Sequence, residues 1–150
     1  MSSQKAPQKA LEDIKVNVKL NLAAAWTSFM FLYIYVDYFH LYMPGSLQDI
    51  LSGKVFVFDI TQAFLLVALA LVIIPALMIF LSVALPAKAN RWTNIIVATA
   101  YIPYMLFNLA GEAWLHMMLG AVVEVVLLLL VIWYAWKWPK QEAFLSGKEN

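Results

Sequence analysis

Residues 60–87 read ITQAFLLVALALVIIPALMIFLSVALPA, and no charged residue interrupts them between Asp59 and Lys88. A helix needs about 20 mainly apolar residues to cross a bilayer, so this stretch predicts a transmembrane helix over 59–85. The same criterion selects three further spans, at 20–43, 91–110 and 112–137. We therefore expect an all-α protein, folded as a four-helix transmembrane bundle in one domain.

The composition agrees with an integral membrane protein. Of the 150 residues, 64% are hydrophobic and 13% are charged, and a domain of this size has too little interior to hide so much apolar surface from water. The lipid bilayer is thus the expected partner. A formal net charge of +1 lacks the excess of positive charge that is typical of nucleic-acid-binding proteins. The absence of cysteine excludes disulfides, thiolate metal sites and thiol nucleophiles.

The positive charges predict the orientation of the spans. Nine of the ten Lys and Arg residues fall on the side of the two polar tails, 1–19 and 138–150, and of the second loop. Only Lys54, in the first loop, falls on the other side. Because cytoplasmic flanks carry an excess of Lys and Arg, we expect both termini to be cytoplasmic. The first apolar run begins too late and is too long for a signal peptide, so it is expected to remain as a span.

Turn and capping residues mark the first outer loop. Pro and Gly at 44–45 end the first span, and Ser46 with Asp49 fits a capping box at the start of a short helix. This helix is expected to lie on the outer membrane interface. Asp59 with Gln62 resembles a second capping pair at the start of the second span.

Proline and glycine positions predict how the helices bend and pack. Pro75 and Pro103 lie inside the second and third spans, where each should kink the helix and free a backbone carbonyl. The connection at 110–112 is short, so the third and fourth spans should be antiparallel neighbours. A face centred on Gly120 would support close helix packing.

Polar side chains recur at helical spacing on three spans, near their outer ends except for Glu124, which lies deeper in its span. They are Tyr33, Asp37 and His40 on the first span, Tyr101, Tyr104 and Asn108 on the third, and Glu112, His116, Gly120 and Glu124 on the fourth. An ionised side chain at mid-bilayer costs about 2.5–3.5 kcal/mol or more, so these stripes should face one another. We predict an outward-facing polar pocket whose ligand-binding residues are Asp37, His40, Tyr104, Asn108, Glu112, His116 and Glu124.

Several of these residues also have a purely structural explanation. Glu112 suits the positive end of a helix dipole, and Asn108 can hydrogen-bond to a neighbouring helix. The tyrosines are suited to packing between helices, and His40 can lie at the depth of the lipid headgroups. Glu124, with apolar neighbours on both sides, is the strongest functional candidate.

Three classes of function fit such a pocket. The leading hypothesis is binding or transport of a small ligand, for which buried carboxyl groups such as Glu124 and Asp37 are suited. Four spans are few for a complete transporter, so transport implies a homodimer. The alternatives are a membrane enzyme that acts on a lipid or quinone-like substrate by acid/base chemistry, and a structural or assembly subunit. No catalytic residue is assigned.

A metal site is not predicted, although its ligand types are present. His40 and His116, with Asp37 and Glu112, are the residue types that bind a transition metal. No Glu-x-x-His or His-Glu-x-x-His signature accompanies them, and the chain has only two histidines. We expect no cofactor.

Short segments of the first three spans carry a family resemblance. They are YVDY at 35–38, TQAFLL at 61–66, LP at 85–86 and ANRWTN at 89–94. With the hydropathy pattern, they resemble a bacterial family of small four-span membrane proteins of unknown function. The layout is loosely similar to the DoxX-like four-helix membrane group. The resemblance implies a four-helix bundle in the bacterial cytoplasmic membrane, and it supplies no activity, substrate or catalytic residue.

Overall fold

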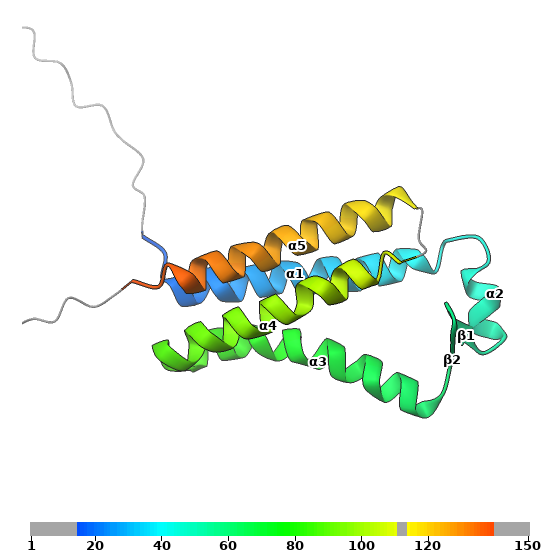
Figure 1. The fold of residues 1–150 in the computed structure, drawn as a ribbon, viewed down its shortest axis with the longest axis horizontal. Helices are drawn as coiled ribbons and strands as arrows, with labels where there is room; N and C mark the ends of the chain where they lie inside the picture. The colour runs from blue at the N-terminus through cyan, green and yellow to red at the C-terminus, as the bar shows by residue number, and fades with distance from the viewer. Residues whose placement is uncertain (1–14, 111–113, 140–150) are drawn as a thin grey trace, which may run out of the picture.

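The computed structural model describes residues 15–110 and 114–139, and four long helices dominate this part of the chain. They are α1 (Val18–His40), α3 (Gln62–Ala84), α4 (Ala87–Phe107) and α5 (Leu115–Trp136). α5 packs against α1 and α4, and α3 packs against α1, which confirms the predicted all-α four-helix bundle (Figure 1).

Three of these helices can cross a membrane by length and composition. α1 and α3 have 23 residues and α5 has 22, and all three are sufficiently apolar. At 1.5 Å per residue, such helices match the roughly 30 Å hydrocarbon core of a bilayer. α4 is nearly as long but more polar, because it carries Asn90 and Asn94, whose side chains are fully buried inside the bundle. The chain is a multi-pass membrane protein.

The two ends of the bundle differ in packing. We call the end where α1 ends and α5 begins the outer end, and the end with the two-residue turn between α3 and α4 the inner end, after the predicted orientation. α1 and α4 each pack against α5, as expected for antiparallel neighbours α4 and α5. α3 lies against α1 at the inner end and diverges from α4 toward its own N-terminus (Figure 1).

Large apolar side chains fill the core between the helices. Trp26 and Phe29 of α1, Met78 of α3, and Leu128 and Val131 of α5 are almost completely buried. The Trp26 and Phe29 rings pack edge to face, with their centroids 5.7 Å apart. In a bilayer such close packing, rather than hydrophobic burial, holds helices together.

A buried hydrogen-bond network joins α1, α3 and α4 at the inner end. Asn94 Oδ1 accepts from Trp26 Nε1 at 2.7 Å and from Ser82 Oγ at 3.2 Å. Asn94 Nδ2 donates to Asn90 Oδ1 at 2.7 Å, and Asn90 Nδ2 donates to the Ser82 carbonyl at 2.5 Å. All four side chains are fully buried, so each finds inside the protein the partners that lipid cannot supply.

Lys19 extends this network at the end of α3. Its Nζ donates to the carbonyls of Val83 and Leu85, at 2.9 and 2.7 Å. These carbonyls belong to the last turn and the C-cap of α3, where no further intrahelical donor exists. A cation at this position therefore caps the helix and attaches the start of α1 to the end of α3.

Both prolines lie inside helices, as predicted. Pro75 in α3 has no N–H to donate to the Leu71 carbonyl. Tyr101 of α4 donates its hydroxyl to that carbonyl at 2.6 Å. The predicted freed carbonyl is thus present at Pro75, and α4 satisfies it. Pro103 lies inside α4.

The predicted short helix in the first loop is present, but its capping box is not. α2 (Ser46–Leu51) has Gly45 as its N-cap, with a φ of +94° and no side-chain hydrogen bond. Ser46 is already inside the helix, so it cannot serve as the cap that the box requires. The helix instead begins on a left-handed glycine, a conformation that costs glycine little.

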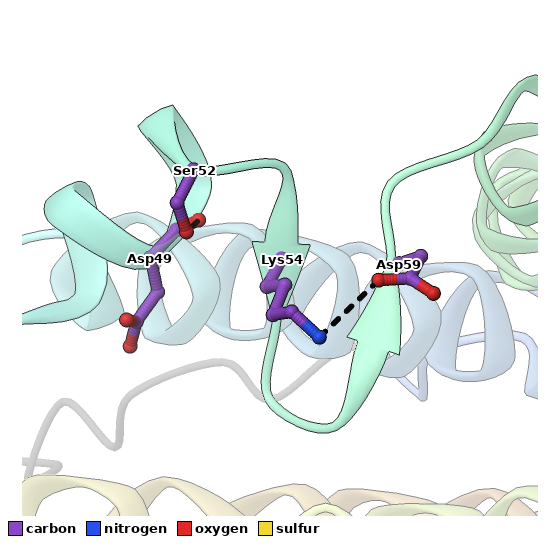
Figure 2. Close-up of polar contacts among 4 residues, drawn as sticks. All are labelled: Asp49, Ser52, Lys54 and Asp59. Carbon is purple, nitrogen blue, oxygen red and sulfur yellow. Dashed lines mark hydrogen bonds and ion pairs between the residues drawn. The ribbon is translucent and has the colours of Figure 1, made fainter.

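A β-hairpin, which the sequence reading missed, follows α2. Strands β1 (Lys54–Val55) and β2 (Phe58–Asp59) pair antiparallel, with Lys54 opposite Asp59. Figure 2 shows the Lys54 ammonium pointing to the Asp59 carboxylate, with Asp49 on the preceding helix and Ser52 at the end of that helix. The Lys54 Nζ and Asp59 Oδ1 atoms are 3.4 Å apart. The predicted capping pair of Asp59 and Gln62 is therefore wrong.

Thr61 caps α3 in place of Asp59. Its Oγ1 accepts a hydrogen bond from the backbone N–H of Phe64 at 3.1 Å. Because the hairpin holds Asp59 in a strand, the next residue with a suitable side chain and an extended backbone takes the cap position.

Gly120 allows α5 to approach α1 closely. A Cβ atom added at this position would lie 2.6 Å from Cγ2 of Val36. Real Cβ contacts are not this short, so the Val36 side chain or one of the two helices would have to shift. The predicted close packing at Gly120 is present, and it lies one helical turn from Glu124.

We expect the Gly120→Ala variant to be less stable than the wild type by about 1–3 kcal/mol, because the added methyl group overpacks the α1–α5 contact. The free energy of unfolding in detergent micelles measures this loss. Combining Gly120→Ala with Val36→Ala should recover part of it. The control is Leu119→Ala, at a neighbouring position that is 64% exposed. A Gly120→Ala variant as stable as the wild type would contradict the contact.

Candidate functional site

A small cavity lies between α1, α4 and α5 in the outer half of the bundle. Its volume is about 20 Å³, enough for roughly one water molecule. Its polar lining consists of Tyr33 and Asp37 from α1, Asn108 at the end of α4 and Glu124 from α5. Apolar side chains, including Met105 and Met117, complete the wall.

Glu124 is the buried carboxyl group of this cavity. Its side chain is 4% exposed, and its Oε1 atom has no hydrogen-bond partner. It lies nine residues into α5, about 14 Å along the helix axis. Burying a polar atom without a partner is unfavourable, and burying a charge without one is more so. The inner network of Trp26 and the two asparagines has no such atom.

Asp37 gives the cavity a second carboxyl group. It is exposed and lies three residues before the end of α1, which is about 5 Å along the axis. α1 ends at His40, so Asp37 lies nearer the helix end than the 20–43 span suggests. One exposed and one buried carboxyl group therefore line the same small cavity.

Tyrosine side chains connect this cavity to the carbonyl that Pro75 leaves free in α3. The hydroxyls of Tyr33 and Tyr104 are 3.0 Å apart and form a hydrogen bond. The Tyr104 ring packs edge to face on Tyr101, with centroids 5.8 Å apart. Tyr101 in turn donates to the Leu71 carbonyl that Pro75 leaves free. A continuous chain of contacts thus runs from α3 through α4 to the cavity wall.

The two histidines do not line the cavity. His40 is partly exposed in the last turn of α1. His116 packs its ring edge to face on Trp114, with centroids 6.0 Å apart, and its Nε2 has no hydrogen-bond partner. Glu112 lies outside the described residues. In the described ranges no three His, Cys, Asp or Glu side chains are grouped to hold a metal ion.

The structure therefore brings together part of the predicted residue set. Asp37, Asn108 and Glu124 line one cavity, and Tyr104 reaches it through Tyr33. The sequence placed Tyr33 on the polar stripe without assigning it to the pocket; its position four residues before Asp37 was the available signal. The inner pair Asn90 and Asn94 was missed as a network, although two asparagines at i and i+4 in an apolar region indicate a polar face.

Comparison with known families identifies one family. The model of a family of unknown function, DUF6326, matches residues 11–145. The chain belongs to this family. Neither a curated protein nor a solved structure matches it. Membership of DUF6326 carries no activity over to the chain, so a function has to be argued from the cavity itself.

Single cysteines placed in this DUF6326 chain test the two carboxylate positions. The natural sequence has no cysteine, so the background is zero. We expect Asp37→Cys to react with a membrane-impermeant thiol reagent in proteoliposomes at a rate near that of the loop control Ser52→Cys. Glu124→Cys should react far more slowly, because its position is buried beside a cavity smaller than the reagent. Equal rates at 37 and 124 would contradict this geometry.

Proposed function

We propose that the chain reversibly binds a small cation, in the first place a proton, at the cavity beside Glu124 and exchanges it with the outer side of the membrane. The observation that carries this proposal is the Glu124 carboxyl group, which is 4% exposed and has an oxygen without a partner. A proton or a bound cation removes the cost of an isolated buried carboxylate.

The volume of the cavity limits the ligand. A space of about 20 Å³ admits a water-sized species. A proton carried on a carboxyl group, a hydronium ion or a dehydrated monovalent cation meets this limit. A lipid or a quinone would require the helices to separate, so the described residues give the enzyme hypothesis no comparable support.

The two carboxyl groups have complementary positions for exchange. Asp37 is exposed near the end of α1, and Glu124 is buried farther along α5. A proton taken up at Asp37 can pass to Glu124 across the cavity, through one water molecule. Asn108 and Tyr33 add an amide and a hydroxyl that can orient such a water.

Further elements of the proposal concern the membrane and the assembly. The orientation inferred from the lysines places the termini in the cytoplasm and Asp37 on the opposite side, in a bacterial cytoplasmic membrane. If the cation crosses the membrane, four helices per chain imply a homodimer. Pro75, whose freed carbonyl is held by Tyr101, provides a hinge in α3 that is linked to the cavity by the tyrosine contacts.

Infrared spectroscopy of proteoliposomes tests proton binding at Glu124. The wild type should show a protonated carboxyl band that appears and disappears as the external pH is cycled. Glu124→Gln should lose this band, whose intensity corresponds to about one carboxyl group per chain, and should keep the amide bands of the helices. Asp37→Asn should keep the band, but the band should appear and disappear more slowly after each change of pH.

Asp49→Asn is the matched control, because Asp49 is an exposed carboxylate on α2 outside the cavity. Its titrating band should equal that of the wild type. Repeating the titration with sodium in place of choline distinguishes the cations, since a competing metal ion would displace the proton from Glu124. A spectrum unchanged by Glu124→Gln contradicts the proposal.

A further inference from the structure

Arg91 lies in an unusual environment at the inner end of the bundle. Its guanidinium carbon is 5.8 Å from the centre of the Trp92 ring and 5.5 Å from that of Trp136. Trp136 belongs to α5, so the guanidinium lies between α4 and α5. Its Nε atom is buried and has no hydrogen-bond partner. Cation–π contacts hold the side chain in place but leave this donor unsatisfied.

A second cation lies next to this arrangement. Lys137 follows Trp136 directly, and its Nζ is 4.5 Å from the centre of the Trp133 ring. The three indole rings are exposed at the surface of the bundle. We call Arg91, Trp92, Trp133, Trp136 and Lys137 the inner tryptophan surface. It combines two positively charged side chains, each in contact with an indole ring, with exposed aromatic side chains.

The described carboxylates lie away from this surface. Asp37 and Glu124 line the outer cavity, and Asp49 and Asp59 lie in the first loop. The single ion pair found within the described ranges joins Lys54 to Asp59, also in that loop. The inner tryptophan surface thus has two positive charges and no described counter-charge.

We propose that the inner tryptophan surface binds the phosphate group of an anionic phospholipid. A guanidinium presents planar N–H donors that match phosphate oxygens, and the contacts with Trp92 and Trp136 hold the Arg91 guanidinium at the inner end of α4 and α5. Lys137 adds a second charge. The exposed indoles suit the boundary between headgroups and acyl chains, and the acyl chains can lie on the apolar faces of α4 and α5.

Native mass spectrometry with defined lipids tests this site. The protein in mild detergent is given equal amounts of phosphatidylglycerol and phosphatidylcholine. The wild type should retain one phosphatidylglycerol molecule in preference to phosphatidylcholine. Arg91→Gln should bind phosphatidylglycerol about tenfold more weakly, as expected for the loss of one charge-assisted contact. Arg91→Lys, which keeps the charge but not the planar donors, should lie between the two.

Lys88→Gln is the matched control, because it removes the same charge from an exposed position one turn earlier in α4. It should bind phosphatidylglycerol like the wild type. Equal weakening by Lys88→Gln and Arg91→Gln, or no preference in the wild type, overturns the proposal in favour of general charge attraction.

Inorganic phosphate added at increasing concentration distinguishes a phospholipid from free phosphate as the ligand of the site. If the site takes a phospholipid, phosphate alone should not remove the retained lipid at millimolar concentration, because the acyl chains also contribute to binding. Displacement at such concentrations would reassign the site to free phosphate and overturn the lipid proposal. This outcome leaves proton binding at Glu124 untouched, since the two sites share no residue.

Discussion

The structure depends on one constraint: inside a bilayer, a polar group has to find its partners within the protein. At the inner end, the network of Trp26, Ser82, Asn90 and Asn94 meets this constraint, because each of these side chains is fully buried and hydrogen-bonded. The network also fixes α1, α3 and α4 relative to one another. Glu124, in the other half of the same bundle, is left with an oxygen that has no partner. The contrast between this network and Glu124 supports a structural role for the network and a functional role for Glu124.

The helix packing produces the cavity in which this exception occurs. Gly120 lets α5 approach α1 at Val36, one turn before Glu124. A space of about 20 Å³ lies beside Glu124, too small for an organic ligand and sufficient for water. Hydroxyl and ring contacts of tyrosine connect the Leu71 carbonyl, which Pro75 leaves free, to the cavity wall at Tyr33.

The sequence predicts features that depend on one helix and fails where several segments compete. Uninterrupted apolar runs identify the helices, and Pro75 predicts its freed carbonyl, because both follow from a single segment. The Asp59 capping pair fails because pairing with Lys54 in a hairpin removes Asp59 from the helix start. In the predicted pocket, helical spacing groups residues on one face, but how that face is turned toward its neighbours depends on packing. That packing brings Asp37 and Glu124 to the cavity wall and leaves His40 and His116 outside it.

The relative stability of two buried-site variants tests the central claim most directly. Glu124→Met replaces the carboxyl group, one oxygen of which has no hydrogen-bond partner, by an apolar side chain of similar size. Asn94→Ala removes a hydrogen-bonded side chain from the centre of the inner network. The free energy of unfolding, measured in the same detergent, should be equal or higher for Glu124→Met than for the wild type. It should be lower for Asn94→Ala, by about 1–3 kcal/mol. A loss for Glu124→Met as large as that for Asn94→Ala would show that Glu124 holds the bundle together, contrary to a role in binding.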